Sequence, residues 1–177
     1  EMLRLADQTA PLDCDDLQRL GISAFLIGGE LEFERCFDRL HRAQVEQGHR
    51  KQAARTAFWL GLTLLFRGEL AQSNAWVARG QRLIENVDCV ERGYLLLPGA
   101  ERILREGNAA EARERSATAT AIGERFGDAD LIGSVNVLRR EPRFNETVRE
   151  RIRELTAVLD VVVPYRSFLQ HFVPHQS

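Results

Sequence analysis

A repeated set of glycine signals constrains the fold of this chain most strongly. Leu20-Gly21 recurs as Leu60-Gly61, and Gly29-Glu30-Leu31 recurs as Gly68-Glu69-Leu70. A third copy of the second signal follows as Gly107-Asn108-Ala109. Self-similarity at a period of about 40 residues is typical of helical-repeat arrays. We therefore expect one supersecondary unit to be repeated along the chain.

Each unit has the pattern of two helices joined by a glycine turn. Apolar residues recur at helical spacing, and sustained alternation of apolar and polar residues is confined to the short run 161–163. Asp13 is placed to cap the first helix, and a glycine that adopts the left-handed conformation is suited to end it. The sequence thus predicts an all-α fold with helices at about 15–28 and 31–47, 51–67 and 70–86, and 90–106 and 109–126.

A helix pair of this length cannot bury its apolar stripe alone, so neighbouring pairs are expected to stack into a solenoid. In the second unit the stripes are formed by Phe58, Leu62, Leu65, Phe66, Trp76, Val77, Leu83 and Ile84. Small residues occupy the same place in each first helix, at Gly21, Gly61 and Ala100. They predict a close approach of the paired helix.

The repeat begins a fourth time after Asp130 and then fails at Arg139-Arg140-Glu141-Pro142. We expect residues 1–138 to form about three and a half helix pairs, and residues 139–177 to form a C-terminal helix and tail. That helix would run from Asn145 to about Val163 and cap the solenoid. Without such a cap, the exposed stacking face predicts self-association.

Composition narrows the classes of partner. With a net charge of −2 and a pI near 6.1, the chain has no overall positive potential that would attract nucleic acid or an anionic membrane. The longest apolar run, 57–66, is about half of the roughly 20 residues that cross a bilayer. Three widely separated cysteines indicate neither a disulfide framework nor a zinc site, and favour a reducing cytoplasm.

Sequence signatures of catalysis are missing. The chain has no phosphate-binding loop, dinucleotide fingerprint, zincin motif or nucleophile elbow. His171 and His175 have the spacing of a helical metal pair, but Pro174 lies between them. The acidic run 13–16 suits a helix N-terminus, and Cys36 and Cys89 suit a core. We therefore expect no metal, no cofactor and no enzymatic activity.

Candidate binding residues lie on the first helices of the second and third units. In a right-handed stack of helix pairs these helices line the concave surface, where a partner binds. The residues are Arg55 and Trp59 in the second unit, and Arg92, Tyr94 and Glu101 in the third. Packing in the core is the alternative role for Trp59 and Tyr94.

Several motifs resemble known repeat proteins. Leu60-Gly61, Leu64, Gly68, Ala112 and Ala119 are similar to the tetratricopeptide consensus, although its Trp, Tyr and Pro landmarks are mostly missing. The segments 57–61, 88–94 and 121–131 resemble the repeat region of large actinobacterial LuxR-type regulators, and the resemblance covers about 15–135. It implies a sensory or assembly role in transcription control. The sequence after Leu138 departs from that family and lacks a recognisable DNA-reading helix.

Three functions remain open from sequence alone. The first is a non-catalytic repeat module that binds a protein, a peptide or another domain of a longer parent, without direct nucleic-acid or membrane binding. The second is a small-molecule sensor with a pocket between first helices. The third is an all-α enzyme whose site would be assembled from scattered polar residues such as His41, Glu46, His49 and Asp88.

Overall fold

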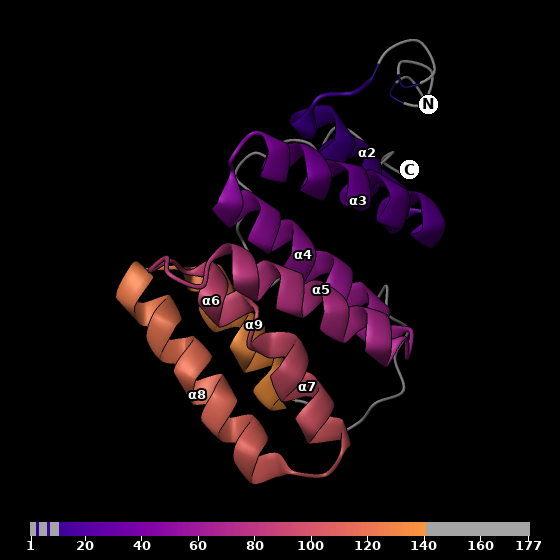
Figure 1. The fold of residues 1–177 in the computed structure, drawn as a ribbon. Coiled ribbons are helices and arrows are strands. Elements are labelled where there is room, and N and C mark those ends of the chain that lie inside the picture. Colours follow the sequence, from indigo (N-terminus) through magenta and orange to yellow (C-terminus); the bar gives the residue numbers. More distant parts are fainter. Residues whose placement is uncertain (1–2, 4–6, 8–10, 141–177) are drawn as a thin grey trace, which may run out of the picture.

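The computed structural model describes residues 3, 7 and 11–140, and from residue 14 on this part of the chain is a succession of helices (Figure 1). In order they are α2 (Cys14–Leu26), α3 (Glu30–Glu46), α4 (Arg50–Phe66), α5 (Leu70–Leu83), α6 (Glu91–Tyr94), α7 (Leu97–Arg105), α8 (Ala109–Phe126) and α9 (Ala129–Arg140). Within the described residues there is no strand, which confirms the all-α prediction. None of these helices has the length and apolar character needed to cross a membrane. The predicted helix 145–163, the tail and the pair His171 and His175 lie outside the described residues.

Most of the helices begin and end close to the limits that the local sequence predicts. Asp13 caps α2 by accepting a hydrogen bond from the backbone N–H of Asp16 at 2.8 Å, and Asn108 caps α8 in the same way. The turns after α2, α4 and α7 contain Gly28, Gly68 and Gly107, whose φ angles are +85°, +83° and +87°. Glycine adopts this conformation without the steric penalty of a Cβ, so the three turns recur at the spacing seen in the sequence.

The predicted helix 90–106 is wrong in one respect, because the structure divides it into α6 and α7. Leu95 and Leu96 form a turn between them, and Pro98 lies in the first turn of α7. Proline has no N–H to donate to the carbonyl of Tyr94, and its ring would clash with that carbonyl in a continuous helix. The chain therefore turns before Pro98. Helix α5 also ends at Leu83, before the predicted limit.

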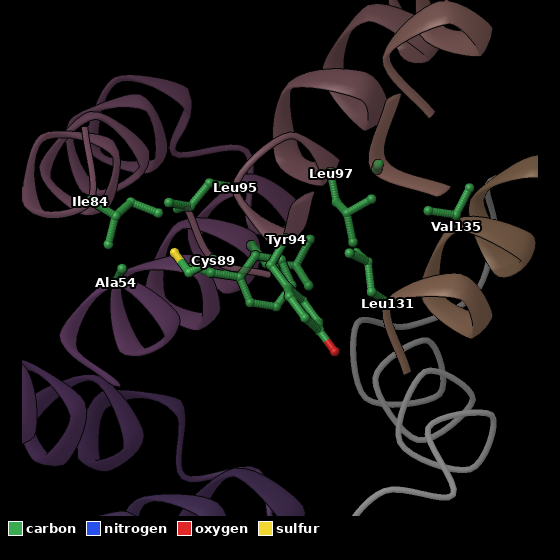
Figure 2. Close-up of a cluster of buried hydrophobic side chains, with 11 residues drawn as sticks. Ala54, Ile84, Cys89, Tyr94, Leu95, Leu97, Leu131 and Val135 are labelled. Carbon is green, nitrogen blue, oxygen red and sulfur yellow. The ribbon is translucent and has the colours of Figure 1, made fainter. Parts of the chain in front are cut away.

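Helix α4 lies at the centre of the packing. It contacts α3 and α5, and also α6 and α7. One buried cluster joins α2, α3 and α4 through Leu20, Phe25, Phe33, Cys36, Phe37 and Leu60. The other joins α4 to the helices after it, with Tyr94 in its middle (Figure 2). Trp59 and Phe66 of α4 pack against both clusters, so this helix connects the two parts of the core.

Glycine allows close contact within the first two helix pairs, as predicted. A Cβ atom at Gly21 would lie 2.6 Å from the ring of Phe37, and one at Gly61 would lie 3.0 Å from a methyl group of Val77. At the second contact the Ser73 hydroxyl donates to the Gly61 carbonyl at 2.7 Å. The first contact leaves little room for adjustment, because the Phe37 side chain is itself buried.

We predict that Gly21→Ala destabilises the protein by about 1–3 kcal/mol, because forcing a methyl group into a packed interface costs that much. Gly99→Ala is the matched control within α7. Its added Cβ would approach only the flexible Arg115 guanidinium, at 3.2 Å. Alanine's higher helix propensity should then stabilise the protein by up to about 1 kcal/mol. Urea unfolding followed by circular dichroism measures both, and equal effects at the two positions would contradict the close contact at Gly21.

Candidate functional site

A cluster of charged and aromatic side chains lies where α4, α6 and the start of α9 meet. The Arg55 Nη2 atom of α4 is 3.3 Å from Glu91 Oε1 of α6 and 3.8 Å from Asp128 Oδ2, just before α9. The Arg55 guanidinium carbon lies 3.5 Å from the centre of the Tyr94 ring. We name these four residues, Arg55, Glu91, Tyr94 and Asp128, the junction cluster. Two of them, Arg55 and Tyr94, are among the residues that the sequence selected.

Tyr94 connects the junction cluster to the core and contacts both Arg55 and Asp128. Its side chain is buried in the core, while its hydroxyl donates to Asp128 Oδ1 at 2.8 Å. Burial raises the pKa of the Tyr94 phenol, and the positive charge of Arg55 opposes this only in part. The phenol is therefore a neutral donor at physiological pH. Its ring face attracts the Arg55 guanidinium by a cation–π interaction, which holds that side chain flat against the core.

Asp128 is positioned by the turn between α8 and α9. Gly127 ends α8 in the left-handed conformation with φ of +66°, and Asp128 follows directly. Asp128 Oδ1 accepts a hydrogen bond from the Leu131 backbone N–H at 2.8 Å, which caps α9. The Gly127-Asp128 pair is a sequence signal for such a cap. Nothing in the sequence shows that the same carboxylate also lies beside Arg55 and Tyr94.

Two atoms of the junction cluster form no hydrogen bond that meets ordinary geometry in the described part of the chain, although the Glu91 carboxylate lies near enough to the Cys89 thiol to add to the rise in its pKa that burial causes. Arg55 Nε and Glu91 Oε2 are buried and form no hydrogen bond there. The contact between Arg55 and Glu91 is also longer than the roughly 2.7–2.9 Å of a strong charge-assisted hydrogen bond. Burying charges costs free energy that only well-made contacts recover. The cluster is thus poorly suited to stabilising the fold, and such sites are candidates for a functional role.

The other predicted residues on this side of the molecule differ in exposure. The Arg55 side chain keeps 29% of its surface exposed. Trp59, one helical turn further along α4, is half-buried and packs on Phe58 with ring centroids 4.9 Å apart. Arg92, next to Glu91 on α6, is exposed. These three side chains can reach a partner without unfolding of the core.

The placement of Tyr94 and Glu101 on an open surface is wrong, because both are buried, at 1% and 2% exposure. Tyr94 fills the core between α4 and α9, which was the alternative role. Glu101 lies 3.3 Å from Arg105 Nε, and Arg105 Nη1 donates to the Leu65 carbonyl at 3.3 Å. The break between α6 and α7 is the physical reason, since one helical face cannot be extended across it.

The four polar residues that an enzyme would need, His41, Glu46, His49 and Asp88, do not form one site. His41 Nδ1 contacts the Ala53 carbonyl at 2.9 Å, and its ring packs edge-on against Trp76. Asp88 forms an ion pair with Arg125, and Glu46 and His49 are exposed near the turn between α3 and α4. Among the described residues there is also no group of three or more His, Cys, Asp or Glu side chains that could hold a metal ion.

We predict that Tyr94→Phe destabilises the protein by about 1–2 kcal/mol, because it removes a buried hydrogen bond to a carboxylate. Asp128 keeps its bond from the Leu131 N–H, and the phenyl ring keeps the contact with Arg55. Tyr94→Leu, which also removes the ring, should cost more. Urea unfolding measures both variants, and a Phe variant as stable as the wild type would show that the hydroxyl contributes no net stability.

Stability should fall as the pH decreases below about 6.5 because of His41. Burial lowers the pKa of its imidazole, with Arg79 and Arg42 adding to this and Asp38 and the Ala53 carbonyl opposing it. The unfolded chain therefore binds the proton first, and the stability present above about pH 6.5 is lost on acidification. His41→Gln should lose less stability than the wild type between about pH 7.5 and 5.5. Equal losses in urea unfolding at these two pH values would contradict the prediction.

No protein-family model, curated protein or solved structure matches the chain.

Proposed function

We propose that the chain is a tetratricopeptide-like helical-repeat module that binds a protein or peptide partner and catalyses no reaction. The observation that carries the proposal is the junction cluster, whose incompletely paired charges lie beside half-buried Trp59 and exposed Arg92. Tryptophan and arginine are, with tyrosine, enriched among the residues that dominate binding energy at protein interfaces. We name Arg55, Trp59 and Arg92 the binding face.

The order and packing of the helices support this proposal. Helices α2, α4 and α6–α7 stand first in their units, and each of these units turns at a positive-φ glycine into its second helix. Consecutive helices pack on one another from α2 to α5 and again from α7 to α9. A stack of such pairs presents its first helices on one surface, which is the surface that repeat proteins use for partners. Arg55, Trp59 and Arg92 all belong to first helices.

The setting that we propose follows from the resemblance to LuxR-type regulators. The module would act in the cytoplasm, beside other domains of a longer regulator, in sensing or in assembly. It would contact the partner by surface complementarity and would leave DNA binding to another part of the protein. The balanced charge of the chain supports this division of roles, because non-specific DNA binding requires a basic surface.

Charge reversal at Arg92 tests the binding face. The immobilised wild type is used to capture partners from the lysate of the source cell, and mass spectrometry identifies them. Each partner is then purified, and its binding is titrated by calorimetry. Arg92→Glu should weaken binding at least about tenfold, as expected for an interface arginine. Arg113→Glu is the matched control, because Arg113 is also exposed but lies on α8, a second helix.

Arg92 is preferable to Arg55 for this test because reversing Arg55 would also disturb the junction cluster. Equal circular dichroism spectra and midpoints of urea unfolding must show that both variants are folded. A partner that binds Arg92→Glu and the wild type equally would exclude Arg92 from the binding face. If the wild type retains no protein at all, the module does not act by holding a protein partner.

A further inference from the structure

Charge is distributed unevenly along the chain, and the pair of helices α4 and α5 carries an excess of positive charge. The whole chain has a net charge of −2, yet residues 50–83 contain six basic residues and one acidic residue, Glu69. Two of the six, Arg55 and Arg67, form ion pairs with carboxylates of neighbouring helices. The other four are exposed and form no ion pair within the described part of the chain; they are Arg50, Lys51, Arg79 and Arg82.

Most of helix α5 is left uncovered by the other described helices. It lies along α4, which is the one described helix with which it packs extensively (Figure 1). Within α5 only Ser73 and Gly80 are buried. Arg79 and Arg82 are three residues apart, so they lie on the same side of the helix. The helix therefore presents two cations to solvent, and its sequence contains no acidic residue.

Trp76 adds a half-buried aromatic ring next to these arginines. The Arg79 guanidinium carbon lies 4.6 Å from the centre of the Trp76 ring. The ring of His41, a buried residue of α3, packs edge-on against the same tryptophan with ring centroids 5.0 Å apart. Trp76 also packs against the buried cluster that joins α2, α3 and α4, so its position is fixed by the core. We name Trp76, Arg79 and Arg82 the α5 face.

The positive charge of the α5 face is not neutralised within the described part of the chain. Arg79 and Arg82 repel each other, because like charges one helical turn apart are unfavourable. The helix dipole favours a cation in the last turn and so stabilises Arg82, but Arg79 lies before that turn. Asp38 and Arg79 both act on the pKa of His41, yet the Asp38 carboxylate is already paired with Arg42 at 2.5 Å. Both arginines of the α5 face are thus available to carboxylates of a partner.

We propose that the α5 face binds an acidic protein segment in which carboxylates flank an apolar side chain. The carboxylates pair with Arg79 and Arg82, because the planar guanidinium group matches the geometry of a carboxylate. The apolar side chain covers Trp76, a residue type that dominates binding energy at interfaces. A protein segment fits better than nucleic acid, since the chain outside residues 50–83 is acidic and would repel the many phosphates that such binding requires. The α5 face lies on a second helix, apart from the binding face, and does not depend on the function proposed above.

Binding of a defined peptide to the full chain tests the α5 face. The probe is a fluorescent peptide of alternating glutamate and leucine, which is titrated with the full chain at low salt while its anisotropy is measured. Peptides that alternate glutamine or lysine with leucine keep the apolar side chains without the negative charge. They should bind at least about tenfold more weakly. Binding of the acidic peptide should also weaken as salt is added, because salt screens the attraction between exposed charges.

Arg79→Gln is the decisive variant, because glutamine removes the charge and keeps a high helix propensity. It should weaken binding of the acidic peptide at least about fivefold, as expected for an arginine that contributes to an interface. Arg113→Gln is the matched control. It removes an exposed arginine from α8, another second helix, and should change the affinity less than about twofold. Urea unfolding must show that both variants are as stable as the wild type.

Equal affinities of the wild type and Arg79→Gln for the acidic peptide would overturn the proposal, as would a wild type that does not bind this peptide at low salt. Single-stranded DNA and vesicles that contain phosphatidylserine are titrated in the same way. If either of them binds the wild type more tightly than the acidic peptide does, and Arg79→Gln weakens that binding, the α5 face is a site for nucleic acid or for an anionic membrane. The proposal of an acidic protein segment is then wrong.

Discussion

The packing of α4 against helices on both sides is the constraint on which the rest of the described structure depends. Trp59 and Phe66 belong to this helix and touch both buried clusters, so neither cluster is closed without it. The close contact at Gly61 brings α5 against one side of α4, while Tyr94 and Phe58 bring α6 against another. A substitution that disturbs this helix therefore affects both buried clusters.

The junction cluster follows from that packing, and its ion pairs contribute little to the stability of the fold. Placing Arg55, Glu91 and Asp128 where α4 meets α6 and α9 removes charges from water, yet the contacts that they form are long and leave two atoms without a hydrogen bond. Replacing buried ion pairs by apolar side chains is often neutral or stabilising, so stability alone does not explain these charges. The charges are better explained by the proposed binding role than by stability.

Local signals in the sequence predicted most of the helices. The turn glycines, the caps at Asp13 and Asn108 and the apolar stripes act within a few residues, so their effect can be read without the fold. Pro98 is also a local signal, and it accounts for the break that the predicted helix 90–106 missed. Arg55 and Tyr94 were selected separately as candidates on different helices, but their contact was not predicted, because they lie far apart in the sequence.

The sequence by itself determined the all-α class and the position of most helix ends, because helix periodicity, capping and glycine turns depend on neighbouring residues. Only the tertiary structure decided which candidate side chains are buried and which are accessible. Tyr94 and Glu101 are polar residues that the sequence could assign to a surface, yet the packing of α6 and α7 on α4 turns them inward. The same packing placed Asp128, the cap of α9, beside Arg55. Burial and charge pairing are set by contacts between distant segments, and for this reason the candidate site became visible only in the folded chain.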